Sequence, residues 1–358
     1  MATNPTIRDV SKLANVSVAT VSAVLNNKQI VHPNTRARVI DAIEKLNYTP
    51  RRLARNLASG KTGNIGFVLG EKHFYRNEPF YTRVFLGAEF EARKHDLYIL
   101  LTSIGDEYSG SRDLPRFLHE QNVDGLIVAG KVHTRILADL FRFHIPVVLV
   151  DYGDDDFYGV RVLLDNADGT AHAVSHLFDM GHTRIGYIGG EFDHPSSKER
   201  FDGYVRAMEE HGLALPLQWV DNREEAMQAD GGDRAFRRLL ENNERPTAVV
   251  CSNDALAMGA IRAAMRAGIR IPEDISIVGF DDVSEGCLMD PPLTTVRVAK
   301  EDLGAVALQT LVEGLTAGFF PKSLVRVRVE LIPRGTTAPP NQRGKTDKGN
   351  GKAKMQED

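Results

Sequence analysis

The sequence predicts a small all-α head followed by an α/β body, in which two doubly wound lobes each contain a parallel sheet covered by helices. Residues 1–49 have apolar positions at helical spacing and no strand-like run. From Asn64 onwards, apolar runs of strand length alternate with helix-length segments, the pattern of parallel sheets covered on both faces. This body spans roughly 275 residues, more than one sheet accommodates, so two lobes are expected.

The first predicted helix lies in "TIRDVSKLA". Thr6 can cap its start, and Asp9 stands three residues later, as in a capping box. The apolar residues of this helix recur at 3–4 spacing and are expected to form one inward stripe. They are Ile7, Val10 and Leu13.

A second helix follows "NVS", in which Asn15 tolerates a left-handed turn and Ser17 can cap the helix. Its expected inward face consists of Val21, Val24 and Leu25. "HPNTRARVIDAIEKLNY" predicts a third helix that begins near Pro33. Two helices joined by a short turn and supported by a third form a helix-turn-helix arrangement.

The outer face of the second helix carries small side chains, which permit close approach to another surface. These residues, outside the inward stripe, are Val18, Ala19, Thr20, Ser22, Ala23 and Asn26. In a helix-turn-helix domain the second helix enters the major groove of DNA. Small side chains on its outer face would let the backbone lie close to the duplex.

Charge is distributed unevenly along the chain. Residues 1–62 contain ten lysines and arginines against three acidic residues, which gives a net charge of +7. Because the whole chain has a net charge of −4, the remaining residues have a net charge of −11. A basic head on an acidic body suggests a polyanionic partner such as nucleic acid. A solvated charged surface would give the same count, so charge alone leaves both interpretations open.

Polar residues stand at the ends of several predicted strands of the body. Asp151, Asn253 and Asp281 follow "PVVLV", "TAVVCS" and "ISIVGF". Ligands of doubly wound sheets bind at the carboxyl ends of the strands, so the sequence predicts a ligand site there. Asp254 and Asp282 are expected to act in helix capping and loop hydrogen bonding instead.

No segment indicates a membrane or secretory location. The N-terminus lacks an apolar h-region, and no apolar run approaches the ~18 residues that cross a bilayer. Cys251 and Cys287 are too few for a disulfide framework, and no His/Cys pair has metal-ligand spacing. We expect a cytoplasmic protein with no membrane partner, no metal and no cofactor.

Two motifs in the head are "TIRDVSKLANVSVATVSAVLNN" and "HPNTRARVIDAIEKLNYTPRRLARNL". In the body, "LLDNADGTAHAVSHLFDMGHTRIGYIGG", "ERFDGYVRAM", "TAVVCSNDALAMGAIRAAMRAGIRIPEDISIVGFDD", "PPLTTVR" and "IPRGTT" follow in order. Together these motifs resemble the lactose-repressor (LacI/GalR) family of bacterial transcription regulators. The resemblance extends to about Pro340.

The resemblance implies a helix-turn-helix domain at 1–49, a hinge and linker at 50–62, and a core of two lobes of periplasmic-binding-protein type at 63–340. One lobe would combine 63–165 with 299–325, the other 166–298 with 326–340, followed by a disordered tail at 341–358. A homodimer would bind a pseudo-palindromic operator in double-stranded DNA at the nucleoid. A small effector, expected to be a sugar or related metabolite, would bind between the lobes and control repression.

The implied DNA-binding positions are Thr6, Ser17, Val18, Ala19, Thr20, Ser22, Ala23, Asn26, Tyr48, Arg51 and Leu57. Leu57 would wedge into the minor groove from a hinge helix, a role that costs stacking energy and gains contact area. An ordinary packing leucine is the alternative. Ala23 stands where many relatives carry an arginine, a residue that commonly reads guanine, so this operator is expected to lack that contact.

The implied effector-binding positions are Phe80, Asp151, Arg200, Met227, Asn253 and Asp281. The fork of donors on Arg200 suits bidentate recognition, and Asn253 and Asp281 can bind vicinal hydroxyls. Phe80 would stack on the ligand, although a bare aromatic can equally be core. Trp219 is expected to pack within a strand.

Two other classes of protein share parts of this pattern. A solute-binding protein would have the two-lobed fold, but it would need a signal peptide and no basic head. A sugar-processing enzyme with an appended head would need a catalytic constellation. No nucleophile–base pair or carboxylate dyad stands out in the sequence, so we expect no enzymatic activity.

Overall fold

The structure, a computed structural model, describes residues 5–25, 28, 30–48, 61–73, 80–105, 107–153, 157–190, 192, 194–224 and 227–341. The chain divides into two compact units, Met1–Gly63 and Asn64–Asp358. Each unit has its own hydrophobic core.

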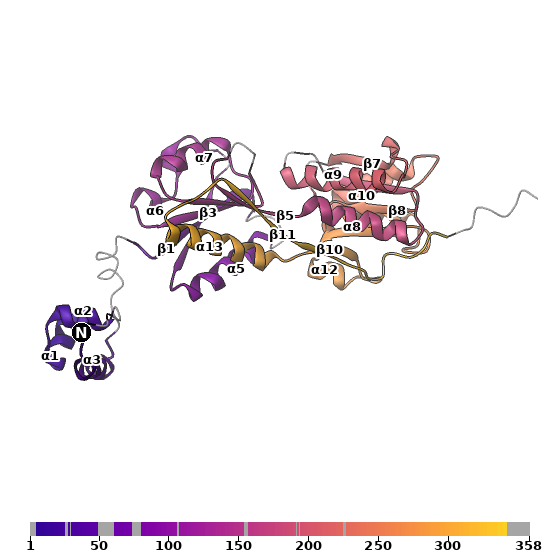
Figure 1. Ribbon diagram of the computed structural model, residues 1–358. Coiled ribbons are helices and arrows are strands. Elements are labelled where there is room, and N and C mark those ends of the chain that lie inside the picture. Colours follow the sequence, from indigo (N-terminus) through magenta and orange to yellow (C-terminus); the bar gives the residue numbers. More distant parts are fainter. Residues whose placement is uncertain are drawn as a thin grey trace, which may run out of the picture. The chain divides into compact units, whose positions relative to one another are not determined.

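The described residues of the first unit form three helices: α1 (Ile7–Ala14), α2 (Val18–Leu25) and α3 (Pro33–Leu46) (Figure 1). Its core consists of Val10, Ala14, Val21, Val24, Val39, Ala42 and Tyr48. The expected stripe on α1 was wrong at one position, because Leu13 is 52% exposed and Ala14 is buried in its place. Ala14 lies four residues after Val10, so it shares the inward face of the helix.

Side chains bond main-chain N–H groups at the starts of all three helices, and at α1 and α2 the residues are those that the sequence indicated. The main-chain N–H of Thr6 donates to Asp9 at 2.8 Å. The Ser17 hydroxyl accepts from the main-chain N–H of Thr20 at 3.1 Å and so caps α2. At α3, Nδ1 of His32 accepts from the main-chain N–H of Asn34 at 3.4 Å.

The first sheet of the body has six parallel strands in the order β11-β5-β4-β3-β1-β2. They are β1 (Asn64–Gly70), β2 (Tyr98–Ile104), β3 (Gly125–Ala129), β4 (Val147–Val150), β5 (Val160–Leu164) and β11 (Ser323–Val327). The order of the strands reverses at β1, because β2 lies on one side of it and β3 on the other. Such a switch point opens a crevice at the carboxyl ends of the strands.

Helices cover both faces of this sheet. On one face lie α5 (Phe80–Lys94) and α13 (Lys300–Ala317), which pack closely against each other. On the other lie α6 (Arg116–His119) and α7 (Thr134–Leu140). Three short 3₁₀ helices complete this lobe: η1 (Glu71–His73), η2 (Ser111–Asp113) and η3 (Phe141–Phe143).

The second sheet has the order β12-β10-β9-β8-β6-β7, parallel except for the antiparallel pair β10–β12. Its strands are β6 (Ile185–Gly190), β7 (Val220–Glu224), β8 (Ala248–Cys251), β9 (Ser276–Asp281), β10 (Thr294–Val298) and β12 (Val329–Ile332). One face is covered by α8 (Asn166–Asp179) and α9 (Pro195–Glu210), the other by α10 (Ala229–Leu240) and α11 (Asp254–Arg266). The short α12 (Ser284–Cys287) follows β9.

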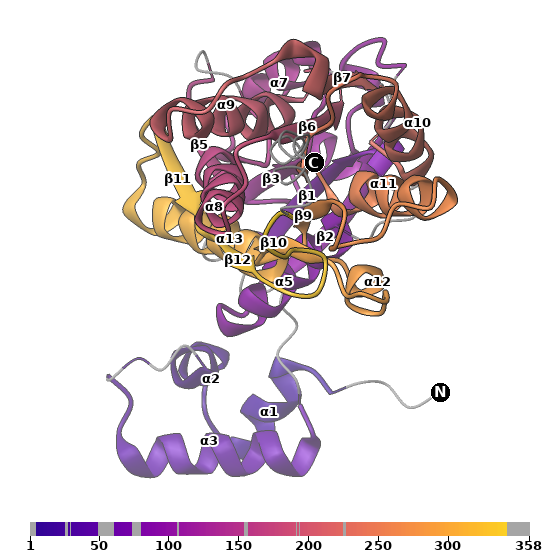
Figure 2. The ribbon, with the colours of Figure 1, turned by 90° about the vertical axis from the view of Figure 1, so that its right-hand side faces the viewer.

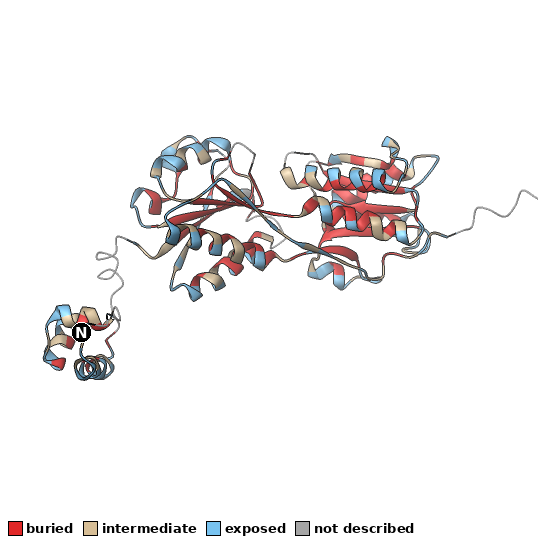
Figure 3. Ribbon diagram, viewed as in Figure 1, coloured by how far each residue is buried: buried red, intermediate tan, exposed pale blue. Residues whose placement is uncertain are grey.

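The central strands of both sheets are buried, whereas the helices have an exposed side (Figure 3). Burial on both faces explains why such strands stand out in the sequence as continuous apolar runs. Seven strands stand out in this way, among them the partly exposed edge strand β2. The strands β5, β7, β10, β11 and β12 did not stand out. β7 reads "VDNRE" and β11 reads "SLVRV", because strands at the edge of a sheet have exposed positions that polar residues can occupy.

The C-terminal part of the chain contributes to both sheets. After β10 the chain forms α13 and β11 on the first sheet, then returns as β12 to the second (Figure 2). The predicted boundary between lobe segments at residue 325 falls inside β11. Trp219 does not lie in a strand, since it ends the 3₁₀ helix η4 (Leu217–Trp219), but it is buried and its Nε1 donates to the main-chain oxygen of Glu244 at 2.9 Å.

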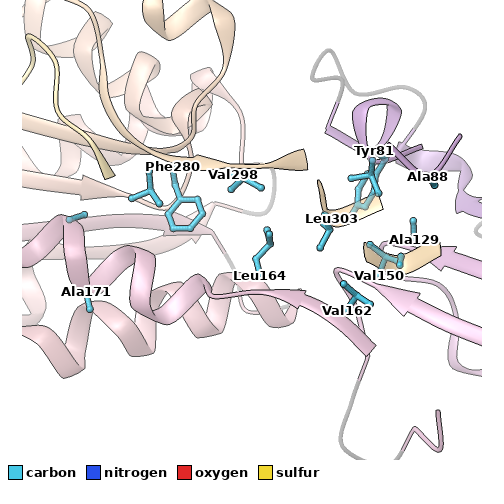
Figure 4. Close-up of a cluster of buried hydrophobic side chains, with 14 of the residues drawn as sticks. Tyr81, Ala88, Ala129, Val150, Val162, Leu164, Ala171, Phe280, Val298 and Leu303 are labelled. Carbon is cyan, nitrogen blue, oxygen red and sulfur yellow. The ribbon is translucent and has the colours of Figure 1, made fainter. Parts of the chain in front are cut away.

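One apolar cluster extends through both lobes (Figure 4). In the first lobe, Ala129, Val150 and Val162 come from neighbouring strands and lie near Leu303 of α13. In the second lobe, Phe280 of β9 belongs to the same cluster. The cluster supports the strand ends that carry the polar residues described below.

Glycines allow pairs of helices to touch. A Cβ on Gly87 of α5 would lie 1.9 Å from the main-chain oxygen of Glu301, and one on Gly304 of α13 would lie 1.8 Å from that of Val84. The α10–α11 pair repeats this arrangement, since a Cβ on Gly259 would lie 1.8 Å from the main-chain oxygen of Ala229.

We expect Gly304→Ala to destabilise the body by about 1–3 kcal/mol or more, because the added methyl group forces α13 away from α5. Urea unfolding followed by circular dichroism measures the change. Gly105→Ala is the control, since its added Cβ would meet only the Glu71 side chain, at 3.2 Å. Equal stability of Gly304→Ala and the parent chain would show that the two helices are not held in contact.

Candidate functional site

The outer face of α2 is open. Val21 and Val24 point into the head, whereas Ser17 and Ala19 are exposed and Val18 is 41% exposed. Thr20, Ser22 and Ala23 are partly exposed. Six of the predicted DNA-contacting residues therefore have exposed surface on α2 or directly before it.

The other predicted DNA contacts lie elsewhere. Thr6 is exposed at the start of α1, where its hydroxyl donates to Asp9 at 2.7 Å. Tyr48 is only 7% exposed and packs in the core of the head, so most of its ring is unavailable to a ligand. Asn26, Arg51 and Leu57 lie outside the described residues.

Arg200 is the centre of a buried polar network in the second lobe. Its Nε donates to Oδ1 of Asn166 at 2.9 Å, and its Nη1 donates to the main-chain oxygen of Ser252 at 2.6 Å. Its Nη2 donates to Oδ1 of Asp281 at 3.2 Å. The guanidinium also lies 3.8 Å from the ring centre of Phe280. The network holds Arg200 rigidly at the strand ends.

Asp281 ends β9 in a backbone conformation that is unusual for a residue with a side chain, with φ of 109°. Its side chain pairs with Arg200, and its main-chain oxygen accepts from Nζ of Lys300. Burial raises the pKa of Asp281, against the opposing effect of Arg200 and Lys300. Non-glycine residues with positive φ cluster at functional sites, and Asp151 and Asp282 share this feature.

Asn253 has a structural task in addition to its predicted one. Its Oδ1 accepts from the main-chain N–H of Leu256 at 2.8 Å and caps α11, and its Nδ2 donates to the main-chain oxygen of Met227 at 3.0 Å. The sulfur of Met227 lies 3.6 Å from Oγ of Ser197 and 3.7 Å from Oγ of Ser252. Met227 and Asn253 therefore lie beside the Arg200 network.

Asp151 follows β4 in the first lobe and is 8% exposed. Its Oδ2 accepts from the Tyr81 hydroxyl at 2.8 Å and lies 4.0 Å from Nε2 of His194 in the second lobe. Burial raises the pKa of Asp151 to about 6, although the Tyr81 hydrogen bond and the Arg200 charge both lower it.

Phe80 is the first residue of α5 and is partly buried. Its ring centre lies 5.0 Å from that of Tyr81 and 5.9 Å from Nζ of Lys300. Phe80 thus lies beside Tyr81 and Lys300, which bond Asp151 and the main-chain oxygen of Asp281 respectively. All six predicted effector-binding residues gather at facing strand ends, and which of them contact an effector stays a prediction.

Five residues at these strand ends were missed from the sequence: His73, Tyr81, Asn166, His194 and Lys300. His73 and Tyr81 have ring centres 4.4 Å apart. His194 caps α9 through Nδ1, which accepts from the main-chain N–H of Ser196. Asn166 and Lys300 begin helices that follow chain crossings between the lobes. The one available signal was position, because four of them, all except His73, stand at or next to the start of a helix.

Other polar residues singled out from the sequence have structural contacts. Asp254 accepts from the main-chain N–H of Val283 at 2.8 Å, and Asp282 pairs with Arg297 and Arg334. Among the described residues, no group of three or more histidine, cysteine, aspartate or glutamate side chains could hold a metal ion. None of the helices in the described part of the chain is long and apolar enough to cross a membrane.

A basic helix-turn-helix head and a two-lobed α/β body with a polar site at its strand ends define a ligand-binding transcriptional regulator. A model for "Bacterial regulatory proteins, lacI family" matches residues 6–51, and one for "Periplasmic binding protein-like domain" matches residues 174–337. The chain is 31% identical over 331 residues to the HTH-type transcriptional repressor PurR of Aliivibrio salmonicida, covering 92% of this chain and 98% of that protein. The chain belongs to the LacI family.

Further relatives and solved structures agree. PurR of Haemophilus influenzae (strain PittEE) is 34% identical over 335 residues, covering 92% of this chain and 97% of that protein. The crystal structure of the Lac repressor dimer bound to operator and the anti-inducer ONPF aligns with a TM-score of 0.74 and 25% identity, over 94% of this chain and all of that one. The complex of the transcriptional regulator CelR with cellobiose aligns with a TM-score of 0.68 and 27% identity, over 93% of this chain and 99% of that one.

The family resemblance and the predicted fold class are therefore confirmed. The chain is a DNA-binding transcriptional regulator of the repressor type, with an effector-binding domain. The relatives named here are transcriptional regulators rather than enzymes.

Proposed function

We propose that the chain represses transcription as a cytoplasmic homodimer that binds a pseudo-palindromic operator and responds to a small polar effector held between its lobes. The observation that carries this proposal is the open face of α2, where Ser17, Val18 and Ala19 are exposed on a basic head. A helix with small exposed side chains fits the major groove, and the surrounding positive charge attracts the phosphates.

The body offers a surface for a second copy of the chain. Phe90 of α5 is 51% exposed, and Leu86 is exposed on the same helix. The adjacent β2 is an edge strand with Tyr98 and Leu101 exposed. Paired heads are what a pseudo-palindromic operator requires, because two-fold protein symmetry matches two half-sites. The solved Lac repressor dimer bound to operator supports this arrangement by analogy.

The site at the strand ends supports control by an effector. Asp151 comes from the first lobe, and Arg200 and Asp281 come from the second, so a ligand that contacts all three favours one arrangement of the lobes. The expected route to the DNA-binding head is the hinge and linker at 50–62 that the family resemblance implies, of which residues 50–60 lie outside the described residues.

We expect Ala19→Glu to lower operator affinity at least about a hundredfold, because it places a carboxylate against the phosphates. Electrophoretic mobility shift on an operator selected from random duplexes measures the effect. Ala37→Glu is a matched control, since Ala37 is also an exposed alanine on a helix of the head but lies on α3. Equal loss in both variants, or none in either, would contradict DNA recognition by α2.

A further inference from the structure

The carboxylate of Asp151 is buried, and no described residue bonds a cation directly to it. Its recorded hydrogen bond comes from the Tyr81 hydroxyl, a neutral group. Among the residues that the structure describes, the one basic side chain within 4.0 Å of its carboxylate is that of His194, at 4.0 Å. Burying an ionised carboxylate is costly unless a cation pairs with it.

Asp281 provides the contrast within the same site. Arg200 bonds its side chain and Lys300 bonds its main-chain oxygen, so this carboxylate has cations beside it. Each nitrogen of Arg200 is already engaged, with Asn166, Ser252 and Asp281 as acceptors. Arg200 therefore acts on Asp151 only through space, and its charge does not overcome the effect of burial on that carboxyl group.

Both residues that approach the carboxylate of Asp151, Tyr81 and His194, have further aromatic rings beside them. His73 lies 4.4 Å and Phe80 lies 5.0 Å from Tyr81, measured between ring centres. The rings of His194 and Tyr152 are 6.2 Å apart. Aromatic faces attract cations, and a carboxylate among several rings is a combination that binds ammonium groups.

We propose that the effector is an amine-bearing sugar or polyol whose ammonium group pairs with Asp151, while its hydroxyls face the Arg200 network. The proposal rests on the effector site proposed above and adds its charge class. A ligand cation would compensate the buried carboxylate of Asp151, to which no described residue bonds a cation. An anionic ligand group placed beside Asp151 would be repelled by its carboxylate.

Matched pairs of probes test this proposal with the full-length protein. Isothermal titration calorimetry at pH 7.0 compares D-glucosamine with D-glucose, D-galactosamine with D-galactose, D-mannosamine with D-mannose, and 1-amino-1-deoxy-D-sorbitol with D-sorbitol. We expect at least one amine-bearing member to bind with a Kd at least tenfold below that of its neutral partner. Its uncharged N-acetyl derivative should lose that advantage.

Asp151→Asn should remove the preference for the amine, so that the amine-bearing member and its neutral partner bind this variant with Kd values within a few-fold of each other. Asp139→Asn is a matched control, because Asp139 also accepts from a tyrosine hydroxyl, that of Tyr108 at 2.6 Å, but lies outside the site on α7. The proposal is wrong if a neutral member binds as tightly as its amine, if no amine-bearing member binds, or if Asp139→Asn has the same effect as Asp151→Asn.

A second measurement needs no ligand. The charged and titratable groups that act on Asp151 are Tyr81, His194, Glu199, Arg200 and Asp281. Burial raises the pKa of Asp151 in the folded state to about 6, above its value in the unfolded chain, so its contribution to stability is present at low pH and is lost as the pH rises through about 6.

Asp151→Asn has no ionisable carboxyl group at this position, so it does not lose stability in this way as the pH rises. Its melting temperature should match that of the parent chain at pH 4.5 and exceed it by roughly 5 °C or more at pH 7.5. A constant difference across this range would show that Asp151 is not an uncompensated charge and would overturn the proposal. A neutral ligand that binds tightly would still leave the proposed effector site standing, and the Ala19→Glu experiment decides DNA binding independently.

Discussion

A chain that lacks residues 1–63 will lose specific operator binding, with affinity reduced at least about a thousandfold. The head carries the exposed face of α2 and a net charge of +7, and both are removed. The remaining chain has a net charge of −11, so nonspecific attraction to DNA should be lost as well. The body has its own core and two complete sheets, and we expect it to fold.

Mobility shift and circular dichroism measure these two outcomes together. A chain that lacks residues 342–358 serves as the truncation control and should keep its operator affinity within a few-fold. Sedimentation equilibrium on both truncated chains shows whether each remains a dimer. Operator binding by the headless chain at undiminished affinity would place DNA recognition in the body and contradict the proposed function.

Much of the fold could be predicted from the sequence, because its signals are local. Capping residues such as Thr6 and Ser17 and the apolar spacing of Val21 and Val24 define the helices of the head. Fully buried parallel strands appear as continuous apolar runs. Edge strands such as β11 lack this signal, because the exposed residues Leu324 and Arg326 alternate with less exposed ones. Such a strand can be recognised only once its neighbour β5 is known.

The site was harder to predict than the fold. Asp151, Arg200, Asn253 and Asp281 were singled out, but their partners come from distant parts of the chain. Asn166 and Arg200 are 34 positions apart, and Tyr81 and Asp151 are 70 apart. Burial and pairing decide whether a carboxylate is neutralised, and neither is visible in a list of residues. For this reason the difference between Asp151 and Asp281 emerged only from the structure.

We expect Arg200→Ala to lower the stability of the body by about 3–5 kcal/mol and to abolish any response to effector. The sequence alone suggests only the second effect, with Arg200 as a ligand contact. In the structure, the substitution also leaves Asp281 buried without its bonded cation and leaves the main-chain oxygen of Ser252 without its donor. Differential scanning calorimetry should show the melting temperature of the body falling by roughly 10 °C.

Arg206→Ala is the matched control, because Arg206 lies on the same helix and pairs with Asp168 at 2.6 Å, but both side chains are about half exposed. An exposed pair of this kind contributes about 0–1 kcal/mol. The double substitution Arg200→Met with Asp281→Asn removes both buried charges and should recover much of the stability lost in Arg200→Ala, without recovering the effector response. If the double variant is no more stable than Arg200→Ala, the loss arises from packing around Phe280 rather than from an unpaired Asp281. These variants therefore separate two roles of Arg200. Its pairing with Asp281 holds the side chain in place and contributes to stability, whereas effector binding requires the guanidinium itself.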